Sequence, residues 1–322
     1  MKIMRSNPVV KMIFICLIAL VCNSCSELLP EIYGNPDGEC KSNCNNTNDE
    51  TTIIIGCDNR VVKPDDIDST EAEPWSFIGR VIGAGCTGTL IADRYVLTGA
   101  HCFQSLGDNP IGFALGQTAN ATIHRPFGTN GARRIFVPHA YQDSNDELDQ
   151  AYDFAIVELW EPVVGATPAQ WGHVDLDVLQ FKPVFTAGYP GTPLAGEFLG
   201  SAVITEGDYL NAQPFEWISG SESGLLYTDL DGTSGQSGSP VYSLLTPSQH
   251  GGEGVIRKVT GVLLGSPEDA CNMGQNWVAQ LTPRVVEQIE NTMSYSGVSD
   301  TAFWEVIDLP FSETTEQGED WP

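Results

Sequence analysis

The stretch "DGTSGQSGSPVY", from Asp231 to Tyr242, places three serines, three glycines and a proline directly before an apolar, strand-like run. It is either a flexible turn or the site of a nucleophilic serine, because a serine hydroxyl needs a base and an oxyanion site beside it to react. Ser237 lies between Gly235 and Gly238, and glycines let the backbone bend tightly and approach a ligand. Such a turn can aim the N–H groups of Gly235 and Ser237 at one point, which is the geometry of an oxyanion hole.

A candidate base lies upstream in "VLTGAHCF", from Val96 to Phe103, where a strand-like run ends in Gly-Ala-His-Cys. Cys102 follows Cys86 by sixteen residues. A bridge between the two cysteines would join neighbouring strands and hold the backbone that carries His101. Closing a loop of this length constrains the unfolded chain by about 3 kcal/mol in the entropic model. This context singles out His101 among the histidines.

A candidate acid lies in "AYDFAIVELWEPV", where Asp153 precedes a strongly apolar run. An acid that enters such a strand is expected to be partly buried, and a buried carboxylate needs a partner such as a histidine N–H. The alternative is that Asp153 only caps a turn, as aspartates often do. This stretch taken alone supports both interpretations equally.

Short strand-like runs separated by Gly, Pro, Asn and Asp extend from about residue 54 to 293. Many short strands with turns between them are typical of a sandwich or of barrels, and about 240 residues would accommodate two small barrels. One helix is expected, from Pro283 to Met293, with proline at its start and apolar residues at helical spacing.

The flanking segments have other compositions. Residues 1–25 combine a basic start, a short apolar run and Ser24 before Cys25, which predicts an export signal with either lipid attachment at Cys25 or plain cleavage near Ser24. Residues 26–53 read as a tether or pro-segment. Residues 294–322 hold seven acidic residues and no basic one, and their aromatic residues predict a tail that docks partly on the barrels.

The 322 residues include 15 basic and 42 acidic side chains, for a formal net charge of −27. This balance argues against a nucleic acid or an anionic membrane as partner, because phosphate binding needs clustered Lys and Arg. Membrane attachment is expected only through a lipidated Cys25. A solvated surface explains the acidity, and bound calcium is the competing explanation.

Six of the nine cysteines lie outside the signal region, an even number that suggests disulfides in an exported protein. A zinc site is disfavoured because these six cysteines show no CxxC spacing and the histidines show no HxxxH spacing. Besides Cys86–Cys102, the guesses are Cys57–Cys271 and, by default, Cys40–Cys44.

The order His101, Asp153, Ser237 resembles that of the chymotrypsin-like serine proteases. The motifs "TGAHC", "YDFAIVEL", "GYPG" and "GQSGSPV" resemble the bacterial glutamyl-endopeptidase branch of that family, over residues 54–293. The resemblance implies an all-β domain of two six-stranded antiparallel β-barrels with a C-terminal helix. It also implies hydrolysis of protein or peptide substrates by a monomer, with no metal or organic cofactor.

The resemblance assigns the roles of the three residues. Ser237 would attack the scissile carbonyl and form an acyl-enzyme, His101 would move the proton, and Asp153 would orient the imidazole. A catalytically silent binding module on a protease fold and a serine esterase are the alternative functions.

The sequence departs from the family in two places. Gln236 stands where digestive members carry an Asp that pairs with the new N-terminal amine, so that ion pair is not expected here. The resemblance places the specificity pocket at Asp231, Gly232, Leu263 and Gly265. Leu263 replaces the histidine of the glutamyl branch, and Asp231 stands where trypsin-like members select basic side chains. We expect poor cleavage after Glu, with a basic or an uncharged residue preferred according to the direction of Asp231.

Overall fold

The computed structural model describes residues 61–63, 74–104, 110–120, 122–142, 147–180, 182–190, 210–222, 224–265, 276–294 and 302–311. The chain divides into the units Met1–Glu39 and Cys40–Pro322, and every described residue belongs to the second unit. The predicted signal with Cys25, the tether, and the cysteines Cys40, Cys44, Cys57 and Cys271 lie outside the described residues.

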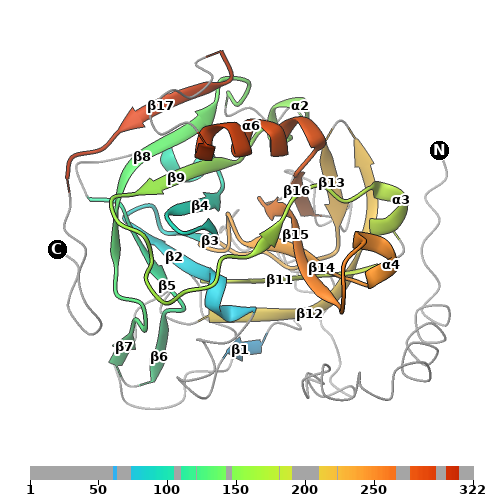
Figure 1. Ribbon diagram of the computed structural model, residues 1–322, viewed down its shortest axis with the longest axis horizontal. Coiled ribbons are helices and arrows are strands. Elements are labelled where there is room, and N and C mark those ends of the chain that lie inside the picture. Colours follow the sequence, from blue (N-terminus) through green and yellow to red (C-terminus); the bar gives the residue numbers. More distant parts are fainter. Residues whose placement is uncertain are drawn as a thin grey trace, which may run out of the picture. The chain divides into compact units, whose positions relative to one another are not determined.

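Six antiparallel strands form the first barrel (Figure 1). An aliphatic and aromatic core that includes Val96, Phe113 and Ile135 fills it. The order around it is β8-β5-β2-β3-β4-β9, and the pairing of β8 with β9 closes the ring. The strands are β2 (Ile78–Ile82), β3 (Cys86–Ala92), β4 (Tyr95–Thr98), β5 (Gly112–Leu115), β8 (Asn130–Pro138) and β9 (Ala155–Leu159). All five residues of β9 are buried, as expected for the apolar run after Asp153.

Six further antiparallel strands form the second barrel in the order β12-β11-β14-β15-β16-β13, closed by the pairing of β12 with β13. They are β11 (Pro183–Gly188), β12 (Leu210–Glu222), β13 (Leu225–Thr228), β14 (Pro240–Leu245), β15 (Ile256–Leu263) and β16 (Asn276–Gln280). Two short strands join this sheet, β1 (Val61–Lys63) on β12 and β10 (Gln170–Trp171) on β15. The predicted fold class, all-β with two six-stranded barrels, is confirmed.

A shared core joins the two barrels. It contains Phe77 and Phe154 from the first barrel and Tyr189, Tyr242 and Trp277 from the second. The ring of Phe77 meets that of Tyr242 edge-on, with 6.4 Å between centroids. The Tyr189 hydroxyl donates a 2.8 Å hydrogen bond to the carbonyl of Gln117 in the first barrel. Burial raises the pKa of both tyrosines, so both hydroxyls stay neutral in this core.

Within the part of the chain that the structure describes, the helices are few and mostly short. They are η3 (Trp75–Phe77), η4 (His101–Phe103), α2 (Glu147–Gln150), α3 (Leu176–Leu179), α4 (Pro247–His250) and α6 (Pro283–Ser294). α6 confirms the predicted helix, and it buries Val285, Ile289 and Thr292, which share one face at a spacing of four and three residues. None of the helices in the described ranges is long and apolar enough to cross a membrane.

Two small elements complete the described chain. The strands β6 (Thr118–Asn120) and β7 (Thr122–His124) form a separate hairpin. The strand β17 (Trp304–Asp308) follows α6 and pairs antiparallel with β8, on the outside of the first barrel (Figure 1). The expectation that the tail docks partly on the barrels is therefore confirmed for residues 302–311.

Candidate active site

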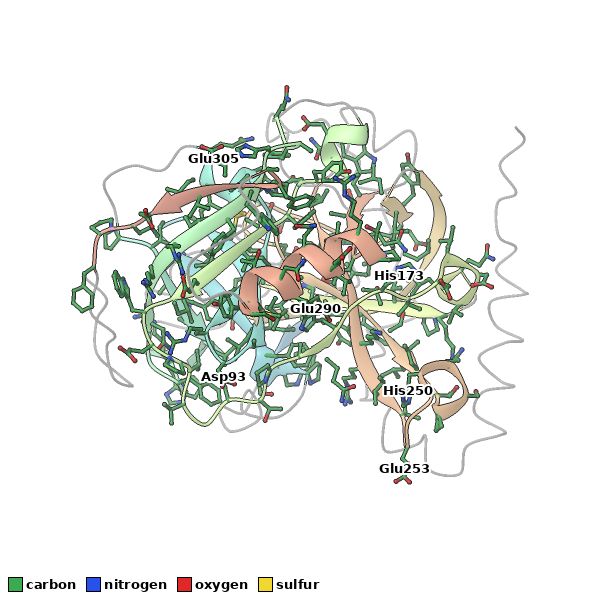
Figure 2. The ribbon with its side chains drawn as sticks, turned by 45° about the horizontal axis from the view of Figure 1, so that its top comes forward. Asp93, His173, His250, Glu253, Glu290 and Glu305 are labelled. Atoms are coloured by element: carbon green, nitrogen blue, oxygen red, sulfur yellow. A yellow bond between two sulfur atoms is a disulfide. The ribbon has the colours of Figure 1, made fainter. Side chains whose placement is uncertain are left out.

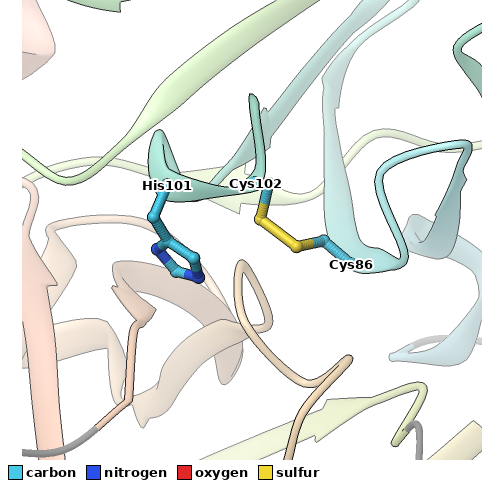
Figure 3. Close-up of side chains that lie close together, drawn as sticks. All are labelled: Cys86, His101 and Cys102. Atoms are coloured by element: carbon cyan, nitrogen blue, oxygen red, sulfur yellow. A yellow bond between two sulfur atoms is a disulfide. The ribbon is translucent and has the colours of Figure 1, made fainter. Parts of the chain in front are cut away.

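His101 opens the one-turn helix η4 directly after β4, and a disulfide fixes the residue that follows it. Cys86 at the start of β3 is bonded to Cys102, with the two Cα atoms 6.2 Å apart, as the sequence predicts (Figure 3). The two sulfur atoms lie close to the His101 ring, but both are in the disulfide and offer no thiolate to a metal. The bridge therefore serves to hold the turn that presents His101.

Asp153 engages His101 with both of its carboxylate oxygens. Its Oδ2 lies 2.6 Å from His101 Nδ1, and its Oδ1 accepts the backbone N–H of His101 at 2.9 Å. The Asp153 side chain is 2% exposed and that of His101 is 27% exposed. The structure thus favours the partnered acid over a turn cap. With Nδ1–H directed at Asp153, Nε2 is the ring nitrogen that can accept a proton.

A turn with two left-handed glycines carries Ser237. Gly235 has φ +88° and Gly238 has φ +85°, and L side chains rarely adopt this region. A Cβ atom on Gly238 would lie 2.2 Å from the carbonyl oxygen of Thr87, so no other residue fits there. The Ser237 hydroxyl donates a 3.2 Å hydrogen bond to the carbonyl of Leu264. The glycine pattern in the sequence is therefore a requirement of the turn.

Thr87, in the first barrel, holds the Ser237 turn from across the barrel boundary. Its N–H donates to the carbonyl of Ser237 at 2.9 Å, and its hydroxyl donates to the carbonyl of Gly235 at 2.8 Å. The same hydroxyl accepts the N–H of Tyr189 at 2.9 Å. Sequence reasoning missed Thr87, and the only available signal was its position after Cys86.

The packing across the boundary between the barrels also brings the Ser237 turn beside the His101 turn. A Cβ atom on Gly238 would lie 3.0 Å from the backbone nitrogen of Gly99, two residues before His101. Glycine at position 238 therefore permits backbone of the second barrel to pack directly against the segment that carries His101.

Gln236 stabilises the turn from within. Its Oε1 accepts the N–H of Thr233 at 3.2 Å and the hydroxyl of Thr233 at 3.1 Å. The backbone N–H of Gln236 donates to the carbonyl of Thr233 at 2.9 Å. Gln236 is 1% exposed. The neutral amide of Gln236 thus occupies the interior of the turn, at the position where digestive members of the family carry an Asp that pairs with the N-terminal amine.

The four expected pocket residues differ in their surroundings. Asp231 is fully buried, Gly232 is partly exposed and Gly265 is exposed. A Cβ atom on Gly232 would lie 3.7 Å from Nδ2 of Asn276, a buried β16 residue that sequence reasoning did not single out.

Leu263 approaches the site through its backbone. Its carbonyl accepts the N–H of Gly238 and its N–H donates to the carbonyl of Ser239, both at 2.8 Å. Its side chain is 1% exposed and packs in the core of the second barrel. A pocket-lining role for this side chain stays a prediction.

Two other histidines make local contacts at the surface (Figure 2). His173 Nε2 lies 3.1 Å from Asp175 Oδ1, and His250 Nε2 lies 3.1 Å from the carbonyl of Gly254. Asp175 is 78% exposed. A histidine beside an aspartate is therefore not distinctive by itself, and burial of the acid sets the His101 pair apart.

Comparisons with known proteins agree with this architecture. Residues 86–245 match the family model of the trypsin-like peptidase domain, a range that contains His101, Asp153 and Ser237. A solved Glu endopeptidase in complex with MPD is 22% identical, with a TM-score of 0.56, over 76% of this chain and 100% of that one. A solved inactivated protease paralogue of the scabies mite is 16% identical, with a TM-score of 0.50, over 72% of this chain and 98% of that one.

The solved structures share the two-barrel fold, and one of them is an inactivated paralogue, so the fold by itself does not establish which residues act. The family model adds sequence evidence over the segment that runs from the disulfide through the Ser237 turn to β14. On that evidence residues 86–245, which contain His101, Asp153 and Ser237, form a trypsin-like peptidase domain.

Proposed function

We propose that the protein hydrolyses peptide bonds through His101, Asp153 and Ser237, by way of an acyl-enzyme. The observation that carries the proposal is the two-point contact of buried Asp153 with His101, because it fixes both the ring and the backbone of the base. Ser237 lies on a rigid turn that packs against the same segment through Gly238. A base held in this way, with a serine on the adjoining turn, is the arrangement that nucleophilic catalysis requires.

The chemistry uses only side chains and backbone of the chain. The Ser237 hydroxyl attacks the scissile carbonyl carbon while His101 Nε2 takes its proton, and Asp153 stabilises the resulting imidazolium. The N–H groups of Gly235 and Ser237 hold the negative oxygen of the tetrahedral intermediate. The C–N bond then breaks, His101 protonates the leaving amine, and water hydrolyses the Ser237 ester by the same route.

Replacing the nucleophile tests the proposal most directly. We expect Ser237→Ala to fold normally and to lose peptide hydrolysis by about 10⁴-fold or more, because only the oxyanion hole and substrate binding remain. Ser234→Ala, at an exposed serine of the same turn, is the matched control and should keep full activity. Near-normal turnover by Ser237→Ala would refute the assignment.

Two further assays separate the alternative functions. Covalent labelling of Ser237 by a phosphonylating reagent is expected of an active enzyme and not of a silent binding module. Cleavage of internal peptide bonds in an unmodified protein substrate is expected of an endopeptidase and not of an esterase, and activity on esters alone would favour the esterase.

For specificity, we propose a pocket with Asp231 at its base. A substrate Glu would then meet a like charge, and an ionised side chain buried without a partner is heavily penalised. We expect the lowest kcat/KM after Glu in a peptide set that differs only at the residue before the cut. Asp231→Ala should selectively remove cleavage after Arg and Lys if Asp231 selects them. Glu as the best residue would refute the pocket argument and leave the triad untouched.

We also propose that the protein is exported, with residues 1–25 as the signal. The Cys86–Cys102 disulfide supports this location, because such bonds persist mainly in oxidising compartments. The mass and N-terminal sequence of the protein recovered outside the cytoplasm would decide between a lipidated Cys25 and a plain cleavage near Ser24. Recovery of the uncleaved chain in the cytoplasm alone would contradict export.

A further inference from the structure

Two aromatic residues at the start of β17 pack against the two residues that flank Asp153. The Phe303 ring meets the Tyr152 ring with 6.4 Å between centroids, and the Trp304 ring meets the Phe154 ring edge-on at 5.9 Å. Phe303 and Trp304 also pack on each other, at 4.8 Å. Asp153 therefore lies on the chain between two rings that the C-terminal segment covers.

The backbone of this segment is fixed on both sides of the two rings. The N–H of His139 donates to the carbonyl of Phe303 at 2.9 Å, and β17 pairs with β8 from Trp304 opposite Pro138 to Asp308 opposite Arg134. We call residues 302–309 the C-terminal strap. Its anchoring to β8 means that the aromatic contacts are made from a rigid element.

Burial shows how closely the strap is integrated. Trp304 is 1% exposed and Phe303 is 7% exposed, although both belong to a segment that the acidic composition had marked as a tail. Trp304 also packs on Phe136 of β8, and the Arg284 guanidinium of α6 lies 5.8 Å from the centre of the Phe303 ring. The strap thus links α6, β8 and the Asp153 segment.

The strap also borders the turn that carries His101. Glu305, labelled on β17 in Figure 2, and Ile307 line an open pocket of about 250 Å³ beside η4. The other lining residues come from η4 with the residue before it, from the end of β8 and from the segment after it: Ala100, Phe103, Gln104, Val137, Tyr141 and Gln142. The strap therefore borders the turn that carries His101 as well as the residues that flank Asp153.

We propose that the C-terminal strap positions Asp153, with Phe303 and Trp304 as the positioning residues. The inference rests on the proposed function, since it assigns them an effect through the His101–Asp153 pair. Both strap residues lie beyond residues 86–245, the range that matches the trypsin-like peptidase model, so this support comes from outside the matched segment. The strap acts by restricting Tyr152 and Phe154, which leaves the Asp153 carboxylate one orientation toward His101.

The test compares Trp304→Ala with Trp304→Phe, with rates normalised to the sites titrated by a phosphonylating reagent. We expect Trp304→Ala to lower kcat by about 10- to 100-fold with little change in KM, because misplacement by about 1 Å costs on the order of 10²-fold. Trp304→Phe should recover most of this loss. Its ring can still pack on Phe154, and the buried Trp304 indole N–H has no acceptor within the described residues.

Val306→Ala is the matched control, because Val306 lies on the same strand with its side chain 36% exposed. It should leave kcat unchanged. A purely structural role for Trp304 predicts a lower Tm for Trp304→Ala with an unchanged kcat per titrated site, and that result would overturn the proposal. If Trp304→Ala does not fold, Phe303→Leu provides the same comparison with a smaller loss of packing.

A spectroscopic readout makes the test independent of turnover. The proton between His101 Nδ1 and Asp153 should give a strongly downfield ¹H resonance, as expected for a short hydrogen bond. We expect this resonance to weaken or move upfield in Trp304→Ala and to persist in Trp304→Phe. An unchanged resonance and an unchanged kcat in Trp304→Ala would refute the strap proposal alone. An active Ser237→Ala variant would refute the proposed function, while the resonance in Trp304→Ala would still test the effect of the strap on the His101–Asp153 pair.

Discussion

The two halves of the candidate site are held by different kinds of interaction. The half that carries His101 and Asp153 has a disulfide, a buried carboxylate and aromatic packing from the C-terminal strap. The half that carries Ser237 has left-handed glycines and neutral hydrogen bonds from Thr87 and within the turn.

The difference follows from what each half must do in the proposed mechanism. The base accepts a proton and becomes charged, so it needs a fixed counter-charge. The nucleophile turn must present backbone N–H groups, so it needs a fixed backbone conformation and no extra charge. Three variants, taken from the largest expected effect to the smallest, test this contrast.

Asp153→Asn removes the counter-charge and keeps the shape. We expect kcat/KM to fall by about 10⁴-fold near neutral pH, because an amide can hold the imidazole in the wrong tautomer. Asp175→Asn breaks the surface pair with His173 and should leave kcat/KM unchanged. A loss below tenfold in Asp153→Asn would contradict the view that the first half works through charge.

Replacing both Cys86 and Cys102 by serine removes the covalent restraint on the His101 turn. The free energy of unfolding should drop by about 3 kcal/mol, as expected for a loop of this length. Denaturant titration of the double variant and of the wild type measures this difference in the free energy of unfolding. The activity of the folded variant should fall much less than in Asp153→Asn, since Asp153 still holds the backbone and ring of His101. Equal losses of activity would show that the disulfide, and not the acid, sets the geometry.

Thr87→Val removes the hydroxyl that contacts the nucleophile turn. It leaves the carbonyl of Gly235 and the N–H of Tyr189 without this partner, so we expect stability to fall by about 1–3 kcal/mol. A loss of about tenfold in kcat should accompany it, because the oxyanion donors depend on the orientation of this backbone. Thr87→Ser keeps the hydroxyl and should stay close to the wild type in both stability and kcat. A Thr87→Ser variant as impaired as Thr87→Val would show that the methyl packing matters and not the hydrogen bonds.

Local patterns in the sequence were sufficient for much of the fold. The short apolar runs between turn residues predicted an all-β domain, and the proline and apolar spacing at Pro283 predicted α6. The pairing of Cys86 with Cys102 followed from two strand-like runs sixteen residues apart. These features depend on residues that lie close together in the sequence, so they can be predicted from a single sequence.

The tertiary structure decided the features that join distant residues. Thr87 and Gly235 are 148 residues apart, and no pattern in either stretch of sequence predicts their hydrogen bond. Asp153 could equally have capped a turn, and only its contact with His101, 52 residues away, settles its partner. The side chain of Leu263 packs in the core of the second barrel while its backbone pairs with the nucleophile turn. The aromatic residues of the C-terminal segment predicted partial docking on the barrels, but only the tertiary structure shows that Trp304 is buried beside Phe154. Such contacts form only when the barrels close and bring remote backbone within hydrogen-bonding and van der Waals distance, and no local pattern records where that closure occurs.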